Sequence, residues 1–172
     1  MASGLNVLPV EAIFQQCFAS DFRTRLVGGA VEPLYLPETE ASFAEIHYRH
    51  DYQRSALHEV AHWCLAGPQR RQLDDYGYWY LPVRNAAQQA AFEAVEARPQ
   101  ALEALFAEAA GVDFRVSSDD VASLPSSAFK ARVAAERRLI QQRLPVRAKR
   151  FLAALNDANS SIVQGASGAV NG

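Results

Sequence analysis

SALHEVAHWCLAGP, residues 55–68, contains two of the four histidines of the chain, with a glutamate between them. If this stretch is helical, His58 and His62 lie one turn apart on the same face, and their imidazoles can converge on one metal ion. Glu59 then lies about 100° further round the helix axis. We expect the fold to be built around a metal-binding helix. The alternative is a helix with two hydrogen-bonded histidines and no metal.

Both ends of this expected helix are marked in the sequence. Asp51 can serve as its N-cap, and we expect it to run to about Ala66. Gly67 predicts a left-handed stop, and Pro68 cannot continue a helix. The preceding segment SFAEIHYRH, residues 42–50, alternates apolar and polar side chains, which is typical of a half-buried strand.

The remaining elements follow from the same patterns. Further helices are expected over residues 9–22, 85–111, 126–144 and 146–158, and extended segments over 28–40 and 76–82. Asn85 and Gln88 resemble a capping box at the start of the second of these helices, and Pro99 interrupts or restarts it. The order lacks a regular βαβ alternation and predicts one α+β domain over residues 1–158, with a small mixed sheet packed against several helices. The small, polar segment 159–172 predicts a disordered tail.

Composition excludes several classes of protein. The 17 basic and 19 acidic residues give a formal net charge of -2, which excludes a global basic field for nucleic acid. Cys17 and Cys64 lie among apolar residues and are expected to be buried thiols, in keeping with a reducing cytoplasm. No apolar run approaches the roughly 20 residues needed to span a bilayer, and no signal peptide precedes the first helix. We expect an unexported protein of the cytoplasm without a specific nucleic-acid partner.

A metal site on the histidine helix needs a third ligand. Cys64 lies on the far side of the helix from His62, and Pro68 stands where a third histidine of a longer HExxH motif would lie. A carboxylate is therefore expected, from Asp75, Glu93 or Glu96.

Helix geometry favours one of these three. The residues Gln88, Phe92, Val95 and Pro99 define an inward face of the following helix. At 100° per residue, Glu96 lies about 60° from the centre of that face and Glu93 about 120° from it. Glu96 is the favoured ligand, although a helix glutamate is more often solvated. Asp75 remains an alternative ligand, or a partner that orients an imidazole N–H.

The identity of the metal divides the possible functions. With zinc, Glu59 would take a proton from a bound water, and the site would hydrolyse a peptide or a nucleic acid. With Fe(II), two histidines and a carboxylate form a facial triad with open positions for O2 and substrate. The motif alone favours the peptidase.

Two other clusters can contact a partner. The aromatic residues Trp63, Tyr76, Tyr78, Trp79 and Tyr80 can wall a pocket, in which Asp74 and Asp75 would receive a cationic side chain; alternatively, the aromatic residues belong to the core. Segment 130–150 holds eight of the 17 basic residues and one acid, Glu136. It is either a solvated helical surface or a docking surface for an acidic macromolecule.

Three stretches of the chain closely resemble one enzyme family. They are FASDFRTRLVGGAVEPLYLP (18–37), SALHEVAHWCLAGPQRRQLDDYGYWY (55–80) and FEAVEARPQALEALFAEAAG (92–111). Together they resemble the elongation factor P hydroxylase family, over about residues 10–155, and this combination is far more specific than HExxH alone.

The resemblance implies an iron enzyme that hydroxylates the β-lysylated lysine of elongation factor P, with O2 as the oxidant. It also implies a fold similar to zincin-like metal proteins, which include a bacterial endoribonuclease. His58 and His62 match the imidazole ligands of the family, and Glu96 matches its carboxylate ligand. Glu59 matches the glutamate of the motif, and we take it as the candidate catalytic residue. An acidic elongation factor P would suit the basic segment 130–150.

Overall fold

The computed structural model describes residues 9–78, 81, 83–118 and 124–168. Its main elements in chain order are α1 (Val10–Phe18), β1 (Thr24–Ala30), β2 (Leu34–Leu36), β3 (Ala44–Arg49), α2 (Gln53–Leu65), α3 (Ala86–Ala110), α4 (Ser127–Gln142) and α5 (Val146–Gly168). Two short 3-10 helices, η1 (Arg70–Gln72) and η2 (Asp74–Gly77), connect α2 to α3. The fold class is α+β, as the sequence predicts.

The sheet is small and mixed. Its strand order is β1-β3-β2, with β3 parallel to β1 and antiparallel to β2. The predicted alternation along β3 is confirmed, because Ala44, Ile46 and Tyr48 are buried while their neighbours are partly or fully exposed. Ile46 lies opposite Leu26 of β1 and Tyr35 of β2, so the central strand ties both edges to the core.

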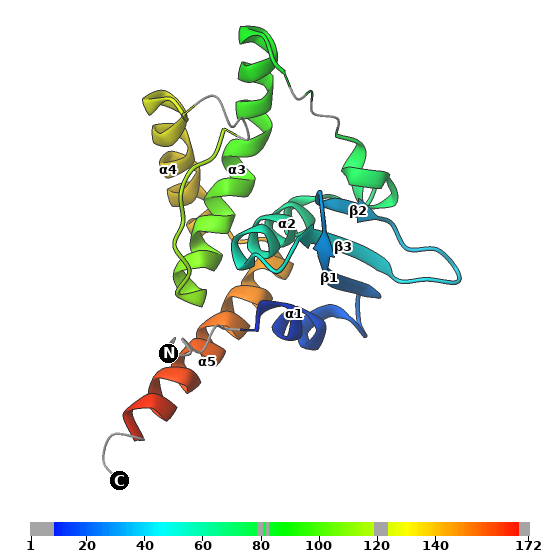
Figure 1. Ribbon diagram of the computed structural model, residues 1–172, viewed down its shortest axis with the longest axis vertical. Coiled ribbons are helices and arrows are strands. Elements are labelled where there is room, and N and C mark those ends of the chain that lie inside the picture. The colour runs from blue at the N-terminus through cyan, green and yellow to red at the C-terminus, as the bar shows by residue number, and fades with distance from the viewer. Residues whose placement is uncertain (1–8, 79–80, 82, 119–123, 169–172) are drawn as a thin grey trace.

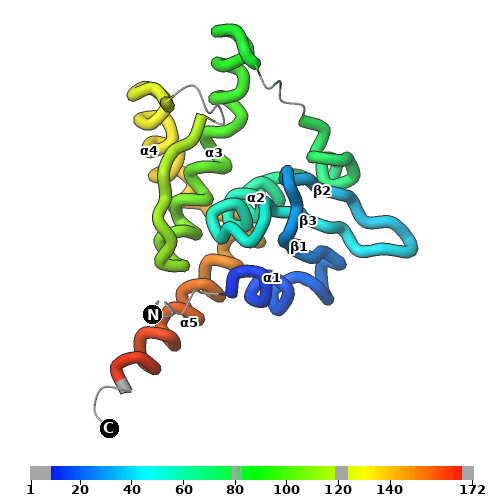
Figure 2. Tube along the Cα trace, viewed as in Figure 1, coloured from blue at the N-terminus to red at the C-terminus, as the bar shows by residue number. Residues whose placement is uncertain are grey.

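Helix α2 occupies the centre of the molecule. It packs against β3 on one side and against α3 and α5 on others, and Figure 1 shows it between the sheet and the long helix α3. The Cα trace in Figure 2 gives the same arrangement, with α4 packed on α3 away from the sheet. The histidine helix is therefore the central element of the fold, as expected.

Helix α2 ends close to the predicted Ala66, at Leu65 with Ala66 as its C-cap, but neither predicted end signal forms. The helix is preceded by Tyr52 rather than capped by Asp51, and no side chain caps its first turn. At its end the chain leaves through an extended Ala66, with φ -63° and ψ 129°. Gly67 does not adopt a positive φ, and a Cβ at this position would meet no atom within 4 Å. The exit of the chain therefore does not require glycine here.

Helix α3 begins as predicted and is longer than expected. The capping box between Asn85 and Gln88 is confirmed, and Gly111 ends the helix in the left-handed conformation. Pro99 lies inside one continuous helix of 25 residues and neither interrupts nor restarts it. Since proline has no N–H, the carbonyl of Val95 lacks its usual helical donor at this point.

The C-terminal segment also differs from the expectation. Helix α5 continues to Gly168, so most of the segment expected to be disordered is helical. Ile162 packs against the main core, and the hydroxyls of Ser161 and Ser167 donate to carbonyls one turn earlier in the helix. The contact of the partly buried Ile162 favours this helix, which small, polar composition does not predict, whereas the serine hydrogen bonds add little to its stability.

The other segments need two adjustments. Helix α1 ends at Phe18, four residues earlier than expected. The aromatic run begins in the η2 turn rather than in an extended segment, and Trp79, Tyr80 and Pro82 lie outside the described residues. In the described part of the chain, no helix combines the length and apolarity that a membrane span requires.

Candidate metal centre

Three predicted ligands meet between α2 and α3. His58 and His62 come from α2 and Glu96 from α3, and one donor atom of each lies within 4.8 Å of the others. The two imidazole Nε2 atoms are 3.1 Å apart. Glu96 places one carboxylate oxygen 2.9 Å from Nε2 of His62 and the other 3.5 Å from Nε2 of His58. All three side chains therefore face one point.

The cluster is largely shielded from solvent, with His58 its most exposed member at 26% of its side chain. The side chain of Glu96 is 4% exposed and that of His62 is 11% exposed. A buried carboxylate is costly unless it is paired, and the two imidazoles are groups that can share a cation with it. The single turn between the histidines and the packing of α3 against α2 produce this arrangement.

A second buried carboxylate orients His58. Oε2 of Glu103 lies 2.8 Å from Nδ1 of His58, and Glu103 is only 6% exposed. An N–H at Nδ1 would donate to this carboxylate and leave the Nε2 lone pair free for a metal. The candidate residues predicted from the sequence do not include Glu103. Its signal is the spacing of seven from Glu96, two helical turns, and its place in the otherwise apolar stretch 101–107 of α3.

The carboxylates also set the proton affinity of the site. Burial alone would lower the pKa of His58, but the adjacent Glu103 and then Glu96 raise it well above its ordinary value. Burial raises the pKa of Glu59, against the opposing effect of the two imidazoles. The cluster thus attracts positive charge, and a divalent cation can take the place of the proton on His58.

The two rival carboxylates lie elsewhere. Oδ1 of Asp75 accepts the backbone N–H of Tyr35 at 2.8 Å and fixes the η2 turn to the edge of the sheet. Glu93 is partly exposed, and Oε1 of Glu93 lies 3.4 Å from the amide nitrogen of Gln89 on the same helix. Among the described residues, neither joins the His58, His62 and Glu96 group.

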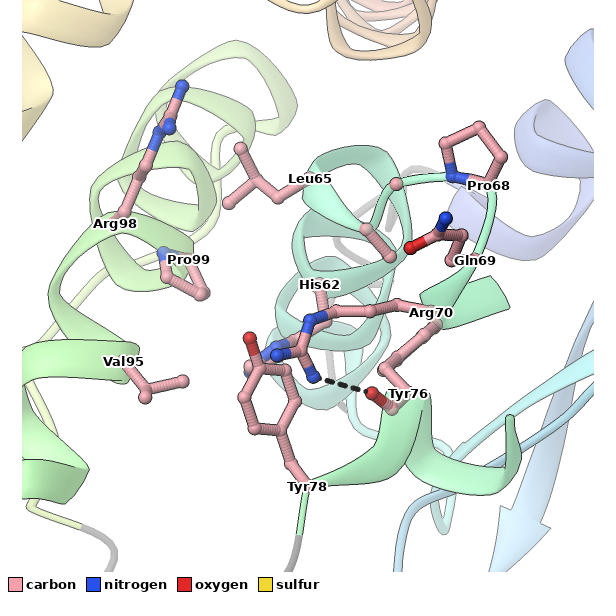
Figure 3. A pocket seen from close by; sticks show the side chains of 12 residues that line it. His62, Leu65, Pro68, Gln69, Arg70, Tyr76, Tyr78, Val95, Arg98 and Pro99 are labelled. Carbon is pink, nitrogen blue, oxygen red and sulfur yellow. Dashed lines mark hydrogen bonds between the residues drawn. The ribbon is translucent and has the colours of Figure 1, made fainter. Parts of the chain in front are cut away.

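A cavity of about 570 Å³ opens beside His62. Figure 3 shows one wall formed by α3 and the other formed by the end of α2 and the segment that follows it. The residues lining it are His62, Leu65, Ala66, Gly67, Pro68, Gln69, Arg70, Tyr76, Tyr78, Val95, Arg98 and Pro99. Nη1 of Arg70 donates to the carbonyl of Tyr76 at 2.9 Å, and its guanidinium lies over the ring of Tyr78. A side chain that enters this cavity reaches His62, one of the three predicted ligands.

The predicted aromatic pocket forms only in part. Tyr76 and Tyr78 line the cavity, but Trp63 is 1% exposed and packs edge-on against Phe14 and Phe18 in the core. Trp63 lies one residue after His62, and the 100° step turns it to another face of α2.

The expected role of the two aspartates in this pocket is also not borne out. Asp75 is held by the sheet, and neither it nor Asp74 lines the cavity. Arg70 and Arg98 line the cavity, so the charge near its walls is positive among the described residues.

Comparison with known proteins identifies the family. Residues 13–164 match the model of a family described as elongation factor P hydroxylase. The chain belongs to the elongation factor P hydroxylase family. An elongation factor P lysine hydroxylase from Haemophilus influenzae is 43% identical to it over 151 residues, which cover 85% of each chain.

In this member of the family, the basic side chains of segment 130–150 do not share one environment. Arg137 pairs with Glu108 and Arg150 with Asp21, while the guanidinium of Arg147 lies over the buried ring of Trp63. The exposed basic residues that remain are Lys130, Arg132, Arg138, Arg143 and Lys149. Three of these lie on α4, which packs on α3 away from α2 in Figure 1. The docking role of this segment stays a prediction.

Proposed function

We propose that this protein is a non-haem Fe(II) monooxygenase that hydroxylates a lysine side chain of elongation factor P. The observation that carries the proposal is the convergence of His58, His62 and Glu96 beside an open cavity, in a chain of this family. The Haemophilus influenzae relative bears the name of an elongation factor P lysine hydroxylase, which supports the same substrate.

The donor set fits an Fe(II) ion. Two imidazoles and one carboxylate are the ligands of a facial triad, which leaves other coordination positions open. The Glu103 carboxylate suits this role, because it fixes the ring of His58 with Nε2 towards the other donors. Bound there, iron would supply the activation of O2.

The residues around the cluster would orient the substrate. Leu65, Val95 and Pro99 give the cavity an apolar wall, against which the methylene groups of a long lysine-derived side chain would pack. The β-lysylated form is longer than lysine itself, and its side chain would extend further into this cavity. Glu59 would accept a proton close to the metal ligands, since its raised pKa makes it a better base than an exposed carboxylate.

We further propose that the core is zincin-like, because a metal-binding helix packs against a small mixed sheet. Residues 1–158 would form the single hydroxylase domain, with the rest of α5 extending from it. We place the enzyme in the cytoplasm, with its protein substrate.

A zinc hydrolase with Glu59 as general base is the alternative, since HExxH is also the motif of such enzymes. Membership of the hydroxylase family disfavours it.

The test is anaerobic reconstitution with Fe(II), followed by O2, a chemical reductant and elongation factor P, read by intact-mass spectrometry. We expect the mass of one added oxygen atom on β-lysylated elongation factor P, and none with the zinc-loaded protein. Comparison of the β-lysylated and unmodified forms identifies the preferred substrate. Turnover by the zinc-loaded protein, without added oxygen, would contradict the proposal.

A further inference from the structure

A second cavity, of about 330 Å³, lies beside another face of α2. His62 lines the first cavity and its neighbour Trp63 lines the second, together with Arg71 and Arg147. Pro68 contributes to the walls of both. The loop that follows α2 therefore separates a cavity at the metal centre from one that the proposed reaction does not use.

Two guanidinium groups converge at this second cavity without a carboxylate. Nη2 of Arg147 donates to the carbonyl of Ala66 at 2.7 Å, and Nη1 of Arg71 donates to the same oxygen. Within the described ranges, neither arginine forms an ion pair, and the one acid that lines the cavity, Glu38, pairs with Arg23. Two like charges at one carbonyl repel each other, and a bound anion would offset this repulsion.

The end of α2 explains only part of this arrangement. The C-terminus of a helix attracts cations, so one arginine at the Ala66 carbonyl is expected. Two guanidinium groups carry ten N–H donors between them, however, and one carbonyl oxygen accepts only two hydrogen bonds. The N–H donors of the two arginines therefore outnumber the hydrogen bonds that the Ala66 carbonyl can accept.

Unpaired donors at the same place point to a ligand independently of the charge. Nε1 of Trp63 and Nη1 of Arg147 are buried, and in the part of the chain that the structure describes neither has a hydrogen-bond partner. Trp63 itself is 1% exposed. Buried donors are rarely left unpaired in native proteins, and each such case calls for a partner. Both residues line the cavity, so a ligand bound there would lie beside these donors.

We propose that this cavity binds one oxyanion, a carboxylate or phosphate group, through Arg71, Arg147 and the indole N–H of Trp63. The guanidinium of Arg147 lies 4.3 Å from the centre of the Trp63 ring, and this contact holds its N–H groups beside the indole N–H. A planar guanidinium can donate two parallel hydrogen bonds to two oxygens of a carboxylate or phosphate. Since Arg70, next to Arg71, lines the first cavity, an anion bound here would also stabilise the wall of the metal site.

The experiment uses metal-free protein, so that its outcome does not depend on iron or hydroxylation. Two-dimensional ¹H–¹⁵N spectra follow the indole N–H resonances of the two tryptophans, which a Trp79→Phe variant assigns. Phosphate and acetate are titrated separately against chloride at equal ionic strength. We expect a saturable shift of the Trp63 resonance and a rise in Tm with at least one oxyanion. A response to phosphate alone identifies a phosphate site, and a response to acetate identifies a carboxylate site.

Variants make the assignment specific. Arg147→Gln and Arg71→Lys should each reduce the affinity for the oxyanion at least tenfold. Lysine keeps the positive charge of Arg71 but lacks the planar pair of N–H donors. Arg132→Gln, an exposed arginine on α4, should respond as the wild type does. If no oxyanion moves the Trp63 resonance beyond the chloride control, the proposal is wrong, whether or not the variants fold. An unchanged affinity in a folded Arg147→Gln variant would also overturn it.

Discussion

The two sides of α2 contact their neighbours through different interactions. One side presents Leu57, Val60 and Trp63, at most 1% exposed, to apolar residues of the core. The other presents His58 and His62 to carboxylates of α3. Apolar packing is stable by itself, whereas buried carboxylates and imidazoles depend on one another for charge and hydrogen bonds. We infer that the apolar side maintains the fold and that the polar side is maintained for metal binding.

The largest expected effect is on the polar side. Glu96→Ala removes one of three ligands and should lower both metal content and hydroxylation, the latter by roughly a thousandfold or more. Glu103 still pairs with His58 in this variant, so the metal-free protein should still unfold cooperatively. Glu93→Ala, on the same helix, is the matched control and should keep its metal. Loss of metal from Glu93→Ala or Asp75→Ala, but not from Glu96→Ala, would show that the ligand set is wrong.

On the apolar side, Trp63→Ala should destabilise the fold without a direct effect on the ligands. We expect a loss of about 3–5 kcal/mol in the free energy of unfolding, because a large buried side chain is removed from contact with Phe14 and Phe18. Urea unfolding of the metal-free protein measures this. Tyr52→Ala, at a site 54% exposed, should cost about 0.5 kcal/mol or less. Equal losses in the two variants would show that the apolar side contributes no more to stability than an exposed position does.

Glu103→Ala should weaken the metal site without abolishing it. The residue holds Nδ1 of His58, and loss of such an orienting partner typically lowers metal affinity about 10- to 100-fold. Competition with a chelator of known affinity measures the change. Glu108→Ala, at an exposed position on the same helix, should leave the affinity unchanged. A full loss of metal would instead make Glu103 a ligand.

The smallest effect separates two stacked tyrosines. The hydroxyl of Tyr35 donates to the carbonyl of Arg71 at 2.8 Å, while the buried hydroxyl of Tyr76 has no partner among the described residues. Tyr35→Phe should therefore lower the free energy of unfolding by about 1 kcal/mol. Tyr76→Phe should leave it unchanged or raise it. Thermal unfolding of the metal-free variants tests this, and a greater loss in Tyr76→Phe would reveal a partner that the structure does not show.

Local patterns in the sequence predicted a large part of this structure. The alternation along β3, the capping box at Asn85 and the spacing of His58 and His62 each depend on neighbours a few residues apart. The choice of Glu96 over Glu93 also follows from helix geometry, and the structure buries Glu96 as expected.

Features that depend on distant residues could not be predicted in this way. Glu103 contacts a histidine 45 positions away, and its carboxylate looks like one of many in a helix. The sequence predicts Trp63 as a pocket residue, and only the packing of α1 against it shows that it belongs to the core. The bond of Asp75 to Tyr35, across 40 positions, leaves no local signal, so the sequence places Asp75 at the substrate or at the metal instead. In each case, the contact that fixes the position of the side chain is with a residue far away in the sequence.

The most direct test is the crystal structure of the protein loaded with Fe(II) under anaerobic conditions, with anomalous data collected at the iron absorption edge. The account predicts one strong anomalous peak within bonding distance of Nε2 of His58, Nε2 of His62 and the carboxylate of Glu96. A peak coordinated by Asp75 or Glu93 in place of Glu96, or no peak at this cluster in a fully loaded crystal, would contradict it.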